Sequence, residues 1–115
     1  MNIIIFGATG RTGQLLVEKA LERGHQVTAF ARSPEKLTGY KDQLEIVQGD
    51  ARDAGKVAEA VSGAEAVISV LGPAENRPVF AVSQATENIL SAMKDQGVKR
   101  LILSAGAGVE DPQDA

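Results

Sequence analysis

The chain of 115 residues is 43% hydrophobic but only 3% aromatic, so we expect one domain, residues 1–115, with an aliphatic core. A net charge of −3 without any basic block argues against nucleic acid and anionic membranes as partners. The absence of cysteine excludes disulfides, cysteine-bound zinc and thiol catalysis. It is also compatible with the cytosol, so we expect a cytoplasmic protein.

Short apolar runs alternate with helical patterns along the whole chain. The runs predict strands over residues 3–6, 26–31, 44–48, 66–71 and 100–104. The patterns between them predict helices over residues 14–23, 35–38, 54–61 and 78–96, with Asp53 as the cap of the third. Connections that contain a helix join parallel strands through a right-handed crossover. This order therefore predicts an α/β fold, a doubly wound parallel Rossmann sheet with five strands in the order 3-2-1-4-5.

Three glycines, Gly7, Gly10 and Gly13, lie between the first strand and the first helix. One explanation is structural, because glycine permits a tight turn and a close approach of helix and strand. The other is that the turn exposes the N–H groups of a helix N-terminus to the pyrophosphate of a dinucleotide. The strand before and the helix after favour the second explanation. A triphosphate site is disfavoured, because Arg11 and Thr12 do not supply the lysine of a P-loop.

The end of the second strand distinguishes between the two nicotinamide cofactors. An NAD site normally has an acidic residue there for the ribose hydroxyls, and an NADP site has cations for the 2′-phosphate. This chain has Arg32, which can pair with a phosphate, and Ser33, which can donate a hydrogen bond or cap the next helix. Lys36 and Arg11 either add positive charge to the site or lie on the solvated surface. The sequence therefore predicts a preference for NADP(H) over NAD(H).

Several segments together resemble a known family. They are "IIIFGATGRTG", "VTAFARSPEKL", "VQGDARD", "AVISVLGP" and "GVKRLILSAGAG". In this order they are similar to segments of the NAD(P)H-binding atypical short-chain dehydrogenase/reductase family, in particular of its biliverdin reductase B/flavin reductase-like and NmrA-like members. The resemblance implies a reductase that transfers hydride from NADPH to a small aromatic or flavin-like acceptor. The alternative is a non-catalytic NADP-binding redox sensor or regulator, or a truncated fragment that only binds the cofactor.

The resemblance also implies a role for each residue that matches a family motif. The matches are the phosphate loop (Gly7, Thr9, Gly10, Thr12 and Gly13), the 2′-phosphate arginine (Arg32, with Ser33 and Lys36 beside it), the pair that borders adenine (Asp50 and Ala51), the wall near the nicotinamide ribose (Leu71, Gly72 and Pro73) and the end of the fifth strand near the nicotinamide (Ser104 to Gly106). For Asp50, the residues alone leave a second role open, at the start of the helix that Asp53 caps.

The chain departs from the family's pattern in two places. Members are usually much longer, with later strands and helices that line the substrate pocket. The fifth strand is followed by Ala105 and Gly106, where members often have two serines. Tyr40 and Lys41 also do not form the Tyr-x-x-x-Lys pair of standard short-chain reductases, but atypical members often lack this pair, so its absence argues against one mechanism and not against the family. The catalytic residues are therefore left unassigned, and no metal site is expected. Without a further strand, the apolar edge at residues 101–103 predicts self-association.

Overall fold

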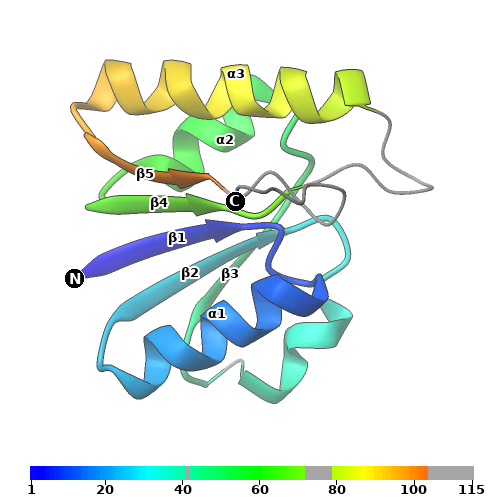
Figure 1. The fold of residues 1–115 in the computed structure, drawn as a ribbon, viewed down its shortest axis with the longest axis vertical. Helices are drawn as coiled ribbons and strands as arrows, with labels where there is room; N and C mark the ends of the chain where they lie inside the picture. The colour runs from blue at the N-terminus through cyan, green and yellow to red at the C-terminus, as the bar shows by residue number, and fades with distance from the viewer. Residues whose placement is uncertain (41, 72–78, 104–115) are drawn as a thin grey trace, which may run out of the picture.

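The computed structural model describes residues 1–40, 42–71 and 79–103, in which strands and helices alternate. In chain order they are β1 (Asn2–Phe6), α1 (Arg11–Glu22), β2 (Gln26–Ala31), the 3-10 helix η1 (Pro34–Tyr40), β3 (Glu45–Gln48), α2 (Ala54–Val61), β4 (Ala66–Ser69), α3 (Val79–Gln96) and β5 (Arg100–Leu103), as Figure 1 shows. No helix in these ranges is long and apolar enough to cross a membrane.

The five strands form one parallel sheet in the order β3-β2-β1-β4-β5, which confirms the predicted α/β Rossmann topology. β1 is the central strand, and its Ile4 lies opposite Thr28 of β2 and Val67 of β4. The chain adds strands on one side of β1 and then crosses to the other side. In doubly wound sheets, ligands bind outside the carboxyl ends of the strands at this switch point.

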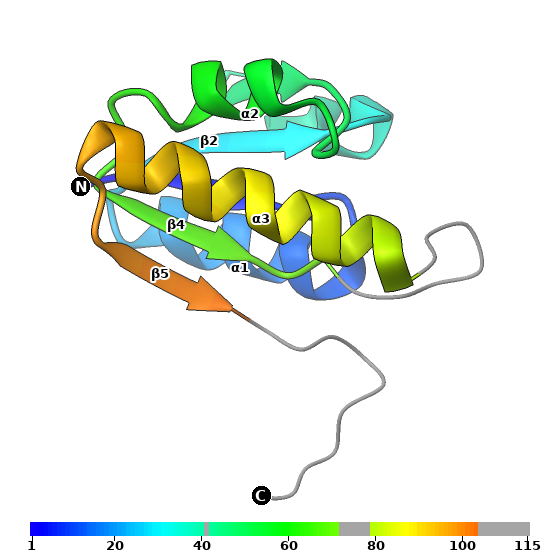
Figure 2. The same ribbon diagram turned by 90° about the horizontal axis from the view of Figure 1, so that it is seen from above.

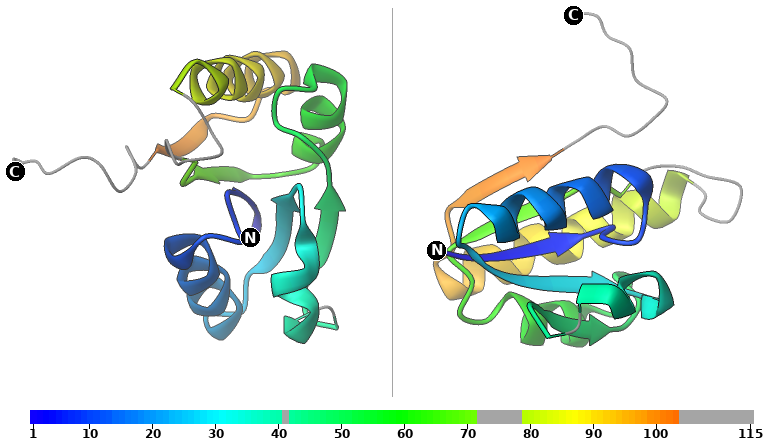
Figure 3. Two further views of the ribbon diagram at one scale, coloured as in Figure 1. Left: turned by 90° about the vertical axis from the view of Figure 1, so that its right-hand side faces the viewer. Right: turned by 90° about the horizontal axis from the view of Figure 1, so that it is seen from below.

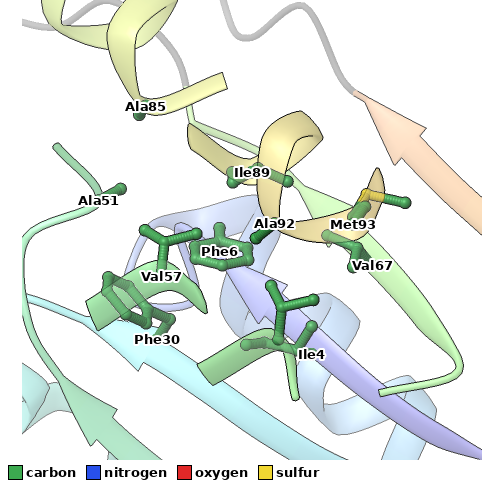
Figure 4. Packing of buried hydrophobic residues seen from close by; sticks show 11 residues of the cluster. Ile4, Phe6, Phe30, Ala51, Val57, Val67, Ala85, Ile89, Ala92 and Met93 are labelled. Atoms are coloured by element: carbon green, nitrogen blue, oxygen red, sulfur yellow. The ribbon is translucent and has the colours of Figure 1, made fainter. Parts of the chain in front are cut away.

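Helices cover both faces of the sheet. α1 and η1 lie on one face, and α2 and α3 pack side by side on the other (Figures 1 and 2). β1 alternates between two cores, because Ile4 and Phe6 belong to the cluster under α2 and α3, whereas Ile3 and Ile5 belong to the cluster under α1. In the first cluster the rings of Phe6 and Phe30 lie 4.8 Å apart (Figure 4). The centre of the sheet is therefore buried on both faces, which leaves the loops at the ends of the strands as the place for a ligand.

Three predicted boundaries are wrong. α1 begins at Arg11 rather than at residue 14, because its first turn carries no apolar side chain that would reveal helical spacing. The short helix expected at 35–38 is a 3-10 helix over Pro34–Tyr40, and β4 ends at Ser69 rather than at residue 71. The other described boundaries agree with the prediction to within one residue. The predicted cap is confirmed, because the Asp53 carboxylate accepts a hydrogen bond from the Lys56 N–H at 3.2 Å.

β5 forms the outer edge of the sheet (Figure 3). In the described part of the chain it pairs with β4 alone. The apolar side chains of Ile102 and Leu103 are 61% and 53% exposed. The outer side of an edge strand also presents unpaired backbone N–H and C=O groups. This edge is therefore both apolar and open to backbone pairing.

Candidate functional site

The candidate site begins at the turn from β1 to α1. Gly7 has a φ of +84°, which residues with a side chain rarely adopt. Its carbonyl oxygen accepts a hydrogen bond from the Gly10 N–H at 3.2 Å, which closes the turn. A Cβ at Gly7 would lie 3.1 Å from the backbone nitrogen of Leu71, so the turn lies directly against the segment after β4. The switch point between β1 and β4 is therefore lined by backbone.

Gly13 lies in the first turn of α1. A Cβ there would collide with the carbonyl oxygen of Gly7 and lie 2.7 Å from the Cα of Ala8, so glycine is needed for the close approach of helix and turn. Gly10 has more room, because an added Cβ would meet only the Gly7 carbonyl oxygen, at 3.6 Å. The backbone at Gly10 is also exposed. It therefore offers a bare surface to a phosphate.

The N-terminus of α1 supplies hydrogen-bond donors. Gly10 precedes the helix and provides no side-chain cap. The Gln14 N–H donates to the Gly10 carbonyl at 2.9 Å. The N–H groups of Arg11, Thr12 and Gly13 come before it, where an α-helix has no acceptor of its own. Together with the positive end of the helix dipole, these donors can bind an anion.

A groove of about 590 Å³ lies beside this helix end. It is lined by Thr9, Gly10, Arg11, Gln14, Leu15, Glu18, Lys36 and Tyr40. The groove brings together Arg11 of α1 and Lys36 of η1, two of the cations predicted for the 2′-phosphate. The side-chain amide of Gln14 donates to the Thr9 carbonyl at 2.8 Å and so holds the loop that forms one wall. Two positive side chains therefore border the phosphate turn.

Arg32 and Ser33 come directly after β2, and both side chains are exposed. The Arg32 carbonyl accepts a hydrogen bond from the Gln48 side-chain amide at 3.2 Å, so the main chain there is tied to the end of β3. Among the described residues, no ion pair involves Arg32, Arg11 or Lys36. All three side chains are exposed and can therefore reach an anionic ligand.

Asp50 lies just after β3 and is paired with Arg52. Its Oδ1 accepts hydrogen bonds from the Arg52 N–H at 2.9 Å and from Nε at 3.2 Å, and its Oδ2 accepts one from Nη2 at 2.8 Å. The side-chain and backbone hydrogen bonds from Arg52 lower the pKa of Asp50 to about 2. Burial opposes this shift, and the charges of Arg52 and Arg32 add to it to a lesser extent. A carboxylate has about four acceptor positions, so about one remains for a ligand.

Ala51 is buried beneath the same turn. It belongs to the cluster that contains Ala85 and Ile89 of α3 (Figure 4). Its carbonyl oxygen accepts a hydrogen bond from Nδ2 of Asn88, also in α3, at 3.0 Å. The loop after β3 is therefore attached to α3 by packing and by a hydrogen bond.

Among the remaining predicted residues, Leu71 is the one that the structure describes. Leu71 is half-buried against the first core cluster and next to Gly7. Gly72, Pro73 and Ser104 lie outside the described residues, as do residues 105 and 106. The described candidates all lie beyond the carboxyl ends of β1 to β4, at the arrowheads in Figure 1. The fold thus brings them together at the carboxyl-terminal end of the sheet.

Two residues at this end of the sheet were not predicted from the sequence. Arg52 stands two positions after Asp50, and this Asp-x-Arg spacing is a local signal of the pairing. Asn88 has no such signal, because it contacts Ala51 across 37 positions of the chain. Only the fold shows that α3 passes over the loop after β3.

Solved structures and curated proteins show what the chain is similar to. The structure of a Rossmann-fold NAD(P)-binding family protein from Shigella flexneri matches it with a TM-score of 0.79 and 26% identity, over 96% of this chain and 54% of that one. The structure of an anaerobillin reductase from Escherichia coli O157:H7 matches with a TM-score of 0.76 and 28% identity, over 96% of this chain and 53% of that one.

A curated protein, the 3 beta-hydroxysteroid dehydrogenase/Delta 5→4-isomerase of Mycobacterium tuberculosis, is 35% identical over 120 residues. The match covers 94% of this chain but 32% of that protein, so the chain spans about a third of its length. A family model described as NAD(P)H-binding matches residues 7–115, from the first glycine of the turn onward. The chain has a Rossmann sheet with a glycine turn at its switch point, and its sequence matches this family model. The chain therefore belongs to the NAD(P)H-binding family.

Proposed function

We propose that the chain binds NADP(H), with the pyrophosphate at the N-terminus of α1, the adenosine beyond β2 and β3, and the nicotinamide toward β4 and β5. The turn at residues 7–10 carries this proposal, because it presents bare backbone and uncapped helix N–H groups at the switch point of the sheet. A pyrophosphate is stabilised by such donors and by the helix dipole. Membership of the NAD(P)H-binding family supports it.

The preference for NADP(H) over NAD(H) is supported by the charges beyond β2. Arg32 stands where an NAD site has an acidic residue, and its planar guanidinium can pair with a 2′-phosphate through two hydrogen bonds. Ser33 can donate a further hydrogen bond. Lys36 and Arg11 add positive charge from the neighbouring groove. A ribose hydroxyl gains much less from these groups than a phosphate does.

The adenine is proposed to lie against Asp50 and Ala51. The acceptor position that Arg52 leaves open on Asp50 suits the exocyclic amine of the base. The Ala51 N–H donates to no other backbone group among the described residues, and it suits a ring nitrogen. Both groups come from the loop after β3, so the adenosine half has its own contacts apart from the phosphates.

NADPH, when bound, supplies a hydride, and the protein supplies binding and orientation. We propose a reductase that transfers this hydride to a small aromatic or flavin-like acceptor. Similarity to a solved structure named as an anaerobillin reductase supports the reductase class. In the described part of the chain, the candidate residues act on the cofactor, by holding its phosphates, ribose and base.

A second candidate function is cofactor binding without turnover. Among the described residues, those proposed above hold the phosphates, the ribose and the base, and none of them is assigned a step in hydride transfer. A redox sensor, or a fragment that only binds, needs the cofactor contacts alone. This alternative shares the binding site with a reductase and lacks only the hydride transfer.

Calorimetric titration with NADPH and with NADH tests the binding proposal. We expect NADPH to bind at least about tenfold more tightly, a difference of about 1.4 kcal/mol. Equal affinities would overturn the preference, and no binding of either would overturn the site. NADPH oxidation is then measured with flavin and quinone acceptors. Oxidation supports the reductase, whereas tight binding without oxidation supports the second function.

A further inference from the structure

One hydrogen bond connects the loop after β3 to a helix that is distant in the chain. Nδ2 of Asn88, in the middle of α3, donates to the carbonyl oxygen of Ala51 at 3.0 Å, in a partly buried position. Ala51 itself packs in the cluster that includes Ala85, about one turn before Asn88, and Ile89, directly after it (Figure 4). α3 therefore holds this loop at a single residue, by packing and by hydrogen bonding.

Two further hydrogen bonds act within the loop. The Asp53 N–H donates to the Asp50 carbonyl at 2.9 Å, and the Arg52 N–H donates to the Asp50 carboxylate at 2.9 Å. These bonds fix the shape of the turn, but they do not fix its position above the sheet. Position comes from the Gly49 N–H, which donates to Ala31 of β2 at 3.0 Å, and from Asn88 on the opposite side.

We propose that Asn88 is a positioning residue for adenine recognition. By holding the Ala51 carbonyl, it sets the direction in which the Ala51 N–H and the Asp50 carboxylate face the base. This inference rests on the proposed binding of NADP(H), and it adds a residue from α3 that does not itself touch the cofactor. Loss of the Asn88 donor leaves a partly buried carbonyl without its partner and releases the loop.

The chain offers a matched control on the same helix. Gln96 lies eight positions further along α3, and its side-chain amide donates to the Ala58 carbonyl of α2 at 2.8 Å. The bond is of the same kind, from an amide of α3 to a backbone carbonyl. It lies toward the end of α3 that leads into β5, about 12 Å along the helix from Asn88.

The experiment compares two variants that replace an amide by an apolar group of similar shape, Asn88→Leu and Gln96→Met. Each is titrated with NADPH and with its analogue that carries hypoxanthine in place of adenine. Hypoxanthine has a carbonyl where adenine has its amine, so the Asp50 carboxylate discriminates against it. We expect Asn88→Leu to bind NADPH about tenfold more weakly and to lose most of the preference for adenine. Gln96→Met keeps both properties.

Urea unfolding of the same samples shows whether each variant is folded. Should Asn88→Leu fail to fold, Asn88→Asp keeps the shape without the donor and is expected to lose the same preference. A variant that is folded and still prefers adenine as the wild type does would overturn the role of Asn88 and leave the proposed function intact. Wild-type protein that binds neither nucleotide would overturn both. An equal loss for the two bases would show a structural effect only and would also overturn the inference.

Discussion

The pKa of the Asp50 carboxyl is lowered mainly by one neighbour, Arg52. Arg52 gives it three hydrogen bonds, and each of them stabilises the ionised form, so the pKa of Asp50 falls from 3.8 to about 2. A carboxyl whose pKa is lowered in the folded state stabilises that state above its unfolded pKa. The contribution is therefore fully present above about pH 4 and is lost as the pH falls toward 2.

Arg52→Ala is expected to raise the pKa of Asp50 toward 3.8, because the hydrogen bonds from the Arg52 side chain and its charge disappear. Arg32→Ala is expected to raise it much less, because Arg32 acts on Asp50 through its charge alone. Carbon-detected NMR of the carboxyl group against pH measures both. An unchanged value in Arg52→Ala, or a larger shift in Arg32→Ala, would contradict the pairing of Asp50 with Arg52.

Single residues differed in how far they could be predicted. Asp50 and Ala51 were predicted through a family resemblance, whereas their physical partners Arg52 and Asn88 were not. A helix or strand pattern describes neighbours along the chain, and the Asn88 contact depends on the sheet order that places α3 over the loop after β3. Contacts of this kind depend on the fold and carry no local spacing.

The contact between α1 and β1 depends on a glycine. Gly13 allows the first turn of α1 to lie against the Gly7 carbonyl, and a methyl group there would collide with backbone that cannot move aside easily. Gly55 is a matched position in the first turn of α2, where an added Cβ would meet only a carboxylate oxygen of Asp53 at 3.6 Å. The two positions are both helical, but only one is in close contact with backbone.

Gly13→Ala is expected to reduce the free energy of unfolding by about 1–3 kcal/mol, because the added methyl overpacks the contact between helix and turn. Gly55→Ala is expected to increase it by about 0.4–1 kcal/mol, since alanine restricts the unfolded chain and fits the helix. Urea denaturation monitored by circular dichroism gives both values. A Gly13→Ala protein as stable as the wild type would contradict this prediction, because it would show that α1 can move away from the turn without loss of stability.

Elements were predicted best where their apolar pattern is continuous. β2 was predicted residue for residue at 26–31, because it is a run of mostly apolar residues between Gly24 and Ser33. The start of α1 was missed by three residues, because its first turn faces the candidate site with Arg11, Thr12 and Gly13. Residues that bind a ligand do not have to be apolar. The apolar periodicity that predicts a helix is therefore weaker at that end of α1.

At the scale of the whole molecule, the sheet is asymmetric. β3 is the edge strand on one side of the sheet. β5 is the edge strand on the other side, and its Ile102 and Leu103 are exposed. We propose that two copies associate through β5. A twofold axis would pair the strands antiparallel. With the axis between Leu101 and Ile102, Arg100 of one copy would lie opposite Leu103 of the other, so like charges would not meet.

Light scattering across a concentration series tests this association. The wild-type mass is expected to rise toward that of a dimer, and Ile102→Lys, which adds a charge to the edge, is expected to remain monomeric. Glu59→Lys, on an exposed position of α2, also makes the chain more positive and is expected to associate as the wild type does. A wild-type protein that is monomeric at every concentration would contradict the proposal.

We propose that the glycine turn and Arg32 together form the site for NADP(H). Titration of Arg32→Ala with NADPH and NADH tests it most directly, with Arg23→Ala, an exposed arginine at the far end of α1, as the control of equal charge. We predict that Arg32→Ala binds NADPH about 10- to 100-fold more weakly, a loss of about 1.4–2.8 kcal/mol, and binds NADH as the wild type does. Unchanged NADPH affinity, or an equal loss for both cofactors, would contradict the claim.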